Sequence, residues 1–366
     1  MARAAILHSR DSELQVDDID VSRPGPGEVQ VDIAYSGICE HDLALLSGLP
    51  STPLPVIPGH GGSGVVSGVG VGVSDVHVGD HVVVCGPTGC GRCYWCLRNE
   101  GWLCPVGHAA VEAGTMLDGT TRVHVRGRPV HQLQSLGTFA STTVVPASSV
   151  MPIHSSIDLR TAALIDCAVL VGLGAATRAA SIGPGDTVLV IGNRSIGLNA
   201  IQGARFGGAG AIVVMGDDVG LLEEDLGATH LVEGHSEDPC DLVTELTHGR
   251  GADVVIETEG TDESIRRAVS CSRIGGQIVL TSAPRPDMAI ALRATTDLLE
   301  SSRTIRGARY GAARPREDVP ILLELQDSGI LRLDRPDLKT VPLVQINDAV
   351  RLLQEGDARQ VLLDHG

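Results

Sequence analysis

From residue 185 onward, short apolar runs alternate with helix-compatible segments, and this alternation restricts the possible folds more than any other feature. The run Thr187–Gly192 has the apolar continuity of a buried parallel strand and ends in a turn. Three further strands are expected at Ala211–Met215, Asp253–Glu257 and Gln277–Leu280, and three helices at Ile196–Phe206, Leu221–Leu226 and Ser264–Ser270. Strands that alternate with helices are typical of a doubly wound parallel sheet. We therefore predict an α/β domain in this part of the chain.

The first 150 residues predict a different architecture, because their pattern is that of short strands. Glu28–Ala34 alternates in a strand-like way, and His81–Val84 is a short apolar run. Glycines are dense from Gly59 to Gly72, which suits tight turns in a barrel of short strands. Helices are expected at Arg160–Ala180, Glu317–Ser328 and Ile346–Glu355. A chain of 366 residues is long enough for two such domains.

Composition excludes several classes of partner. The formal net charge of -17 argues against nucleic acid and anionic membranes, because there is no basic excess to neutralise phosphates. No apolar stretch is long enough to cross a membrane, and the N-terminal residues lack a signal-peptide pattern. We therefore expect a cytoplasmic protein, and in a reducing compartment clustered cysteines are metal ligands more often than disulfides.

Four of the nine cysteines lie within 15 residues as C-x2-C-x2-C-x7-C. They are Cys90, Cys93, Cys96 and Cys104, in a loop expected to cover residues 85–105. Zinc binds four thiolates tetrahedrally, and such a site has no open position for substrate. The spacing therefore predicts a structural zinc site. We do not expect a zinc finger that binds nucleic acid. The loop has only two basic residues, Arg92 and Arg98, and the whole chain is strongly acidic.

Cys39, His60 and Cys167 are candidates for a second metal site. Each of them alone is more often a packing residue. Two thiolates and one imidazole are nevertheless a known ligand set of catalytic zinc, with the fourth position open to water or substrate. Six of the nine cysteines are therefore candidate zinc ligands, and we expect the remaining Cys85, Cys240 and Cys271 to be packing thiols.

These motifs together resemble the zinc-containing medium-chain dehydrogenase/reductase superfamily, the alcohol dehydrogenase family, over essentially the whole chain. The resemblance rests on Gly37-Ile38-Cys39 with Asp42, Gly59-His60, the four-cysteine loop, Cys167 followed by Gly172-Leu173-Gly174-Ala175-Ala176, and Thr187–Gly192. Among the branches, it is most similar to the glutathione- and mycothiol-dependent formaldehyde dehydrogenases and their bacterial relatives. A long loop after Cys104, Asp318-Val319-Pro320 and Ile346-Asn347 carry that finer likeness.

The resemblance implies a GroES-like β-barrel catalytic domain of residues 1–168 and 310–366 and a Rossmann domain of residues 169–309. It makes Cys39, His60 and Cys167 the catalytic zinc ligands, with Asp42 orienting His60. It implies two zinc ions per chain and a nicotinamide cofactor. Zinc would act as a Lewis acid on the oxygen of an alcohol or carbonyl substrate, and hydride would pass to or from the nicotinamide. It also implies a homodimer that extends the Rossmann sheet near Ala283–Arg306.

The cofactor loop departs from the family pattern G-x-G-x-x-G, because it reads Gly192-Asn193-Arg194-Ser195-Ile196-Gly197. Arg194 replaces the glycine that lets the backbone approach the pyrophosphate, so it either crowds the phosphates or binds them by charge. Glu40, after the first zinc ligand, replaces a basic residue or histidine. We hypothesise that Glu40 and Arg194 form an ion pair across the cofactor cleft; the alternative is that both face solvent.

Two further positions bear on the cofactor. Arg359 matches a family arginine that contacts the pyrophosphate. The acidic residue that binds the cofactor ribose is expected at the end of the second strand. Gly216 occupies that place, and Asp217 or Asp218 follows it, so NAD(H) is favoured over NADP(H).

Departures also occur beside the catalytic ligands. His41 stands where the family has Ser or Thr, and its imidazole can act as an acid or base near neutral pH; the alternative is a surface histidine. Gly61 replaces a glutamate that follows the histidine ligand. Asp166 and Ala168 flank Cys167 where the family favours glycines.

We therefore predict a zinc- and NAD(H)-dependent alcohol dehydrogenase or carbonyl reductase that acts on a small-molecule alcohol, aldehyde or ketone. The departures at the cofactor phosphates leave a second function open: a non-redox or cofactor-impaired zinc enzyme, such as a lyase, an isomerase or an accessory protein on the same scaffold. Binding of an added dinucleotide would distinguish the two.

Overall fold

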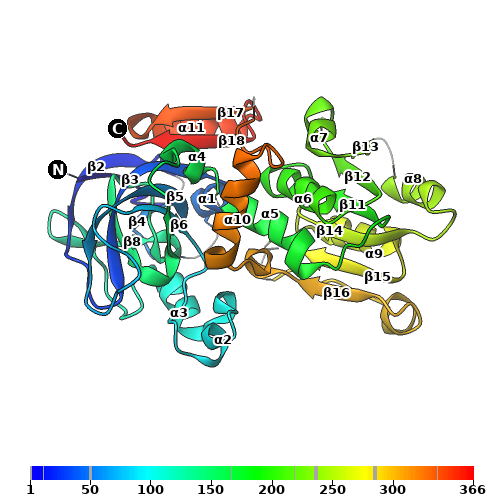
Figure 1. Ribbon diagram of the computed structural model, residues 1–366, viewed down its shortest axis with the longest axis horizontal. Coiled ribbons are helices and arrows are strands. Elements are labelled where there is room, and N and C mark those ends of the chain that lie inside the picture. Colours follow the sequence, from blue (N-terminus) through cyan, green and yellow to red (C-terminus); the bar gives the residue numbers. More distant parts are fainter. Residues whose placement is uncertain are drawn as a thin grey trace. The chain divides into compact units, whose positions relative to one another are not determined.

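The computed structural model describes residues 2–10, 12–48, 52–165, 167–217, 219–234, 238–282, 287–335 and 337–366 (Figure 1). Contacts within the chain form two compact units. The first contains Met1–Cys167 and Arg314–Gly366, and the second contains Ala168–Ala313. The C-terminal segment therefore returns to the unit formed by the N-terminal half of the chain.

The first unit is built on two β-sheets. One has the strand order β1-β2-β7-β8-β4, and the other has the order β10-β6-β5-β3-β18-β17 with β9 paired to β3. Their bounds are β1 Ala2–Ile6, β2 Gln15–Val21, β3 Glu28–Ile38, β4 Val56–Ile57, β5 Gly61–Val69, β6 His81–Cys85, β7 Val123–Val125, β8 Arg128–Gln132, β9 Thr142–Pro146, β10 Val150–Ile153, β17 Leu338–Pro342 and β18 Gln360–Asp364. The predicted barrel of short strands is confirmed, including the strands that begin at Glu28 and His81.

The glycine-rich segment is needed because β5 lies very close to β3. A Cβ atom at Gly64 would lie 2.1 Å from the carbonyl oxygen of Asp32, which no side chain can occupy. Gly62 is equally tight, because its Cβ atom would lie 2.5 Å from the carbonyl oxygen of Tyr35. The sequence pattern thus reflects close backbone packing as well as turns.

Six helices of this unit are described, and α11 shows how the C-terminal segment joins its core. They are α1 Glu40–Leu46, α2 Tyr94–Leu97, α3 Pro105–Ala113, α4 Leu159–Ala163, α10 Pro315–Asp327 and α11 Ile346–Gln354. Ile346 and Ala349 of α11 are buried in one apolar cluster with Ile6, Phe139 and Leu363. Because β18 also pairs antiparallel with β3, the two ends of the chain share one hydrophobic core.

The second unit is a parallel sheet with the strand order β13-β12-β11-β14-β15-β16. Its strands are β11 Thr187–Ile191, β12 Ala211–Gly216, β13 His230–Glu233, β14 Ala252–Glu257, β15 Ser272–Leu280 and β16 Thr304–Gly307. Its helices are α6 Ser195–Phe206, α7 Leu221–Leu226, α8 Pro239–Leu246 and α9 Asp262–Cys271. The order changes direction at β11, which creates the crevice where such sheets bind ligands. The doubly wound prediction is confirmed.

Residues 160–180 do not form the single helix that their composition suggests. They contain the end of α4, then α5 Cys167–Gly174 and a π-helical turn, Ala175–Ala179. Asp166, one of the family departures, lies outside the described residues. Among the described residues, no helix is long and apolar enough to span a membrane.

One prediction about cysteines is wrong. Cys240 and Cys271 are joined by a disulfide of 2.05 Å and are not packing thiols. The cause is the packing of α8 beside α9, which brings the two Cα atoms to 4.6 Å although 31 residues separate them in the sequence. Cys85, the third cysteine in that prediction, is fully buried in β6.

Candidate active site

Cys39, His60 and Cys167 come together although they are distant in sequence. Cys39 precedes α1, His60 precedes β5, and Cys167 begins α5. Their ligand atoms all lie within 4.8 Å of one another, and the Cys39 Sγ and His60 Nε2 atoms are 3.3 Å apart. Cys39 and His60 are buried. Two thiolates and one imidazole converging in a buried position fit a zinc ion with one open coordination position.

Gly59 is required for this arrangement. It has a φ of +86°, which is the left-handed region that glycine adopts without strain. A Cβ atom at Gly59 would also lie 2.3 Å from the Phe139 ring. The Gly59-His60 pair is therefore a backbone device that turns His60 toward Cys39.

Asp42 connects two of the three ligands. Its Oδ1 atom lies 3.2 Å from His60 Nδ1 and accepts the backbone N–H of Gly59 at 2.9 Å. Its Oδ2 atom accepts the backbone N–H of Cys39 at 3.1 Å. A carboxylate on Nδ1 fixes the ring so that Nε2 is directed to the metal position. The predicted role of Asp42 toward His60 has this geometric basis.

The charges of this cluster depend on one another. Burial opposes ionisation of Asp42, but the charge and hydrogen bond of His60 hold the pKa of its carboxyl below the usual value. Burial works against a charged His60, yet Asp42 and Cys39 raise the pKa of that imidazole. The contact with Cys167 and burial raise the pKa of the Cys39 thiol. Metal binding must therefore displace protons from this site, and we expect it to weaken in acid.

His41 is half-buried beside the cluster, and not a surface histidine. Its ring meets the His60 ring edge-on, with 5.1 Å between centroids. The Nε2 atom of the Gln134 side-chain amide lies 2.9 Å from the Nε2 atom of the His41 ring. Because an amide N–H donates there, the neutral His41 ring carries its hydrogen on Nδ1. Gln134 was not predicted from the sequence, and its own backbone has a φ of +57°, which a sequence pattern does not reveal.

The four-cysteine loop forms a second compact donor set. The sulfur atoms of Cys90, Cys93, Cys96 and Cys104 lie within 4.8 Å of one another. Cys104 caps α3 by accepting the backbone N–H of Gly107 at 3.3 Å, and it also accepts the N–H of Cys90 at 3.3 Å. The backbone N–H of Cys96 lowers the pKa of the Cys93 thiol to about 7, whereas burial raises that of Cys96 to about 12. Four sulfur donors fit a closed structural zinc site.

The predicted cofactor loop follows β11 at the carboxyl edge of the parallel sheet. Gly192 has a φ of +96°, and a Cβ atom at Gly197 would lie 1.9 Å from the Gly192 carbonyl oxygen. Arg194 has a φ of -77°, which any residue can adopt, so the loop closes without the middle glycine. The Arg194 side chain is exposed, Ser195 is buried and Ile196 is half-buried.

The end of β12 is tied to this loop. The Asn193 amide donates to the carbonyl oxygen of Asp217 at 2.8 Å and to Glu223 Oε1 at 3.0 Å. A Cβ atom at Gly216 would lie 2.3 Å from the Asn193 side chain, so glycine is required there. Asp217 is exposed at the carboxyl end of β12. Asp218, the alternative ribose ligand, lies outside the described residues.

Two predicted contacts stay predictions. Glu40 belongs to the first unit and Arg194 to the second, so their ion pair is not tested. Arg359 is half-buried just before β18 in the first unit. Gly61, the residue that replaces a family glutamate, is buried at the start of β5 and pairs with Cys85.

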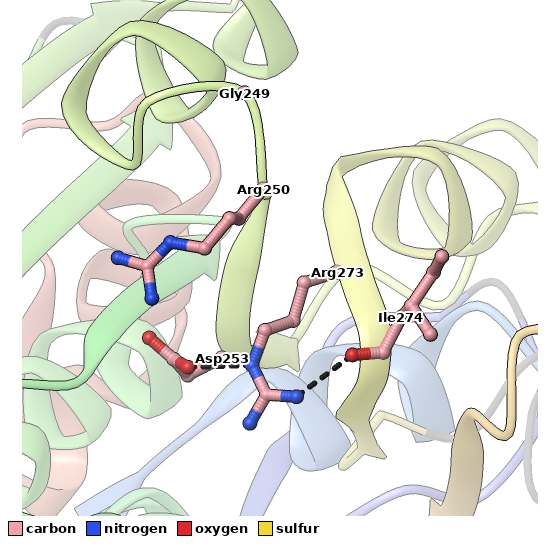
Figure 2. A pocket seen from close by; sticks show the side chains of 5 residues that line it. All are labelled: Gly249, Arg250, Asp253, Arg273 and Ile274. Carbon is pink, nitrogen blue, oxygen red and sulfur yellow. Dashed lines mark hydrogen bonds and ion pairs between the residues drawn. The ribbon is translucent and has the colours of Figure 1, made fainter.

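A surface cavity of about 520 Å³ lies at the other edge of the parallel sheet, near the beginnings of β14 and β15 (Figure 2). Gly249, Arg250, Asp253, Arg273 and Ile274 line it. Arg273 donates to Asp253 at 2.6 Å and to the Ile274 carbonyl oxygen at 2.7 Å. None of the predicted site residues lines this cavity. The Asp253 carboxylate in it is already hydrogen-bonded to Arg273.

Comparisons with known proteins agree with these two sites. The model of the alcohol dehydrogenase GroES-like domain matches residues 25–155, and the model of the zinc-binding dehydrogenase matches residues 195–328. A putative alcohol dehydrogenase D of Mycobacterium tuberculosis is 36% identical over 358 residues, which cover 96% of each chain. This chain belongs to the zinc-containing alcohol dehydrogenase family.

Two other relatives extend the likeness. An S-(hydroxymethyl)glutathione dehydrogenase of Synechocystis is 33% identical over 361 residues, with 97% of each chain covered. An alcohol dehydrogenase zinc-binding domain protein from Burkholderia ambifaria has a solved structure with a TM-score of 0.94 and 27% identity, covering 99% of this chain and 98% of that one. The likeness therefore spans both units.

The leading prediction of function is confirmed at this level. The chain is a zinc-dependent alcohol dehydrogenase with a catalytic Cys-His-Cys site and a structural four-cysteine site. It is an oxidoreductase that acts on CH–OH groups with a nicotinamide cofactor.

Proposed function

We propose that this alcohol dehydrogenase uses NAD(H) in preference to NADP(H), and that its substrates are hydroxymethyl adducts of low-molecular-weight thiols. The observation that carries the chemistry is the buried Cys39, His60 and Cys167 cluster that Asp42 anchors. Asp217 at the end of β12 supports the preference for NAD(H). The likeness to an S-(hydroxymethyl)glutathione dehydrogenase supports the substrate class.

The residues of the first unit have separate tasks in this proposal. Cys39, His60 and Cys167 hold the zinc, which supplies Lewis-acid polarisation of the substrate oxygen when it is bound. Asp42 orients His60 through Nδ1 and keeps the imidazole basic enough to act as a ligand. Burial of Cys39 and His60 excludes water from the metal side, which strengthens every charge interaction there.

We assign proton transfer to His41. Gln134 occupies the Nε2 atom of its ring, so the Nδ1 hydrogen is the one that His41 can exchange with a substrate oxygen or a water. Thr88 fixes Gln134 in turn, because its hydroxyl donates to the Gln134 carbonyl oxygen at 3.2 Å. This bond holds the backbone of the residue whose side chain contacts His41.

The cofactor would be held by the second unit's loop. Gly192, Ser195, Ile196 and Gly197 form the turn and first helical residues that receive the pyrophosphate at the N-terminus of α6. Arg194 adds a positive charge there, and the role of Arg359 at the pyrophosphate stays what the family resemblance implies. These roles support nicotinamide dinucleotide binding despite the missing glycine.

Ion pairs within the protein hold the polar loop that follows the four-cysteine site. Arg122 binds Glu28 at 2.7 Å and Asp118 at 2.6 Å. These contacts fix the loop to β3 and leave Arg122 and Asp118 engaged within the protein. The proposed substrate class therefore rests on the family likeness and not on this loop.

We also propose a homodimer and a cytoplasmic location. Among the described strands, β16 is the last of the parallel sheet, and a second copy could extend the sheet there. Residues 283–286 of the region expected at this interface lie outside the described residues. Two clusters of cysteine ligands suit a reducing compartment, whereas the Cys240–Cys271 disulfide does not. Sedimentation and cell fractionation test these two proposals.

The proposed activity is tested by following NADH formation with zinc-loaded protein. The panel contains S-(hydroxymethyl)glutathione, S-(hydroxymethyl)mycothiol, a primary aliphatic alcohol and benzyl alcohol, each with NAD⁺ and with NADP⁺. We expect the highest kcat/KM with a thiol adduct and NAD⁺. A higher kcat/KM with a plain alcohol contradicts the substrate class, and a higher value with NADP⁺ contradicts the coenzyme preference.

A further inference from the structure

Glu259 lies against the first glycine of the cofactor loop. It follows β14 by two residues, and a Cβ atom built on Gly192 would lie 3.0 Å from Glu259 Cγ. Thr258 fixes this approach, because its backbone N–H and its hydroxyl both donate to the Ile191 carbonyl oxygen, at 3.0 and 2.8 Å. The Glu259 carboxylate is exposed and therefore accessible to a ligand in the crevice.

Glu259 and Asp217 follow the two strands that flank β11. Asp217 directly follows β12 and Glu259 lies two residues after β14, and the loop after β11 is the one proposed to receive the pyrophosphate. Burial and the negative charges of Glu257 and Asp217 raise the pKa of Glu259. Because β12 and β14 both pair with β11, the two carboxylates follow the neighbouring strands at the carboxyl edge of the sheet.

The charged neighbours of Glu259 have contacts of their own. Glu257 is fully buried, and its Oε1 atom accepts the backbone N–H groups of Glu259 and Gly260 at 2.8 and 2.7 Å. Arg267 opposes the negative charge on Glu259, but it already binds Glu263 at 2.9 Å. Arg194, on the loop itself, is a further cation.

We propose that Glu259 is a specificity-determining residue, which acts with Asp217 to reject a dinucleotide that carries a 2′-phosphate on its adenosine ribose. The inference rests on the proposed function, that the second unit binds a nicotinamide dinucleotide. A ribose 2′-hydroxyl donates a hydrogen bond to a carboxylate, whereas a 2′-phosphate brings about two negative charges toward it. Rejection by an unfavourable charge contact is a common source of specificity.

The test measures binding of NADH and NADPH to the zinc-loaded full-length protein by nicotinamide fluorescence. The proteins compared are the wild type, Glu259→Gln and Asp217→Asn. The matched control is Glu245→Gln, which removes an exposed carboxylate from α8 of the same unit. Circular dichroism and thermal unfolding establish that each variant is folded.

We expect the wild type to bind NADH more tightly than NADPH. Glu259→Gln should tighten NADPH binding about tenfold, and NADH binding by no more than about twofold, because one like-charge contact is removed from NADPH alone. The control should leave the ratio unchanged. High salt should reduce the discrimination of the wild type, because salt screens exposed charges.

Equal effects of Glu259→Gln on NADH and NADPH overturn the inference, since both coenzymes carry the pyrophosphate. An unchanged ratio also overturns it, as does a wild type that prefers NADPH. In those cases dinucleotide binding itself, and with it the function of the second unit, still holds. A wild type that binds neither coenzyme overturns both.

Discussion

Asp42 is the residue on which the catalytic site most depends at the scale of single side chains. Asp42→Asn keeps the shape of the side chain but removes the negative charge that lies beside the Nδ1 atom of His60. We expect zinc affinity at the catalytic site to fall about 10–100-fold, and kcat with it. Competition with a chelator measures that affinity. Asp32→Asn on β3, whose carboxylate accepts only hydroxyl hydrogen bonds, is the control, and equal zinc affinity in both variants would contradict the role of Asp42.

His41 is the second residue whose role can be measured directly. His41→Ala removes the proposed proton-transfer group and should lower kcat about 10²-fold or more, with a shifted pH dependence. Gln134→Leu should act in the same direction with a smaller effect, because it loses only the hydrogen bond to Nε2. Steady-state kinetics of thiol-adduct oxidation test both variants. An unchanged pH profile in His41→Ala removes this residue from the reaction.

His365 makes stability depend on pH. Burial lowers the pKa of this imidazole from 6.5 to about 4, so the folded chain keeps it neutral where the unfolded chain takes up a proton. Stability is therefore fully present above about pH 7 and falls as pH drops through 6.5 toward 4. By pH 5 the loss should be about 2 kcal/mol. Urea unfolding at pH 7 and pH 5 should show this loss in the wild type and not in His365→Gln; identical losses would contradict it.

Single residues were predicted from the sequence only where a motif marks them. The four cysteines of the structural site are marked by their spacing, whereas the roles of Cys39, His60, Cys167 and Asp42 were implied by the family resemblance. Gln134 and Glu259 carry no such mark. Gln134 reaches His41 through a left-handed turn, and Glu259 reaches Gly192 through the pairing of β11 with β14. Both relations arise from tertiary structure.

At the scale of elements, we expect the four-cysteine loop to hold its zinc independently of the catalytic site. It connects β6 to α3, and Cys104 is its buried member and the cap of α3. Cys104→Ser should lose one zinc per chain and lower the melting temperature, while the catalytic site keeps its zinc, because the two ligand sets share no residue. Metal analysis and calorimetry measure this. Loss of both zinc ions would contradict independent sites.

The elements predicted best are those with strong apolar patterns. The strand beginning at Thr187 and the helix ending at Phe206 agree closely with β11 and α6. β13 and β16 were not predicted, because they are short and carry polar residues near the edges of the sheet. The disulfide between Cys240 and Cys271 was missed because only the packing of α8 against α9 brings these cysteines together.

At the scale of the whole molecule, the two units divide the chemistry. The first holds both zinc sites, and the second holds the crevice at the switch point of a parallel sheet. The alternating pattern predicted the second unit, while the return of the C-terminal segment to the first was implied by family resemblance. Sequence periodicity alone does not show that β18 pairs with β3.

The central claim is that Cys39, His60 and Cys167 form the catalytic zinc site of an alcohol dehydrogenase. The most direct measurement is zinc content per chain together with alcohol-dependent NADH formation, for the wild type and His60→Ala. We predict about two zinc ions and activity in the wild type, and about one zinc ion with activity reduced by about 10³-fold or more in the variant. A His60→Ala protein that keeps both zinc ions and its activity would contradict the claim.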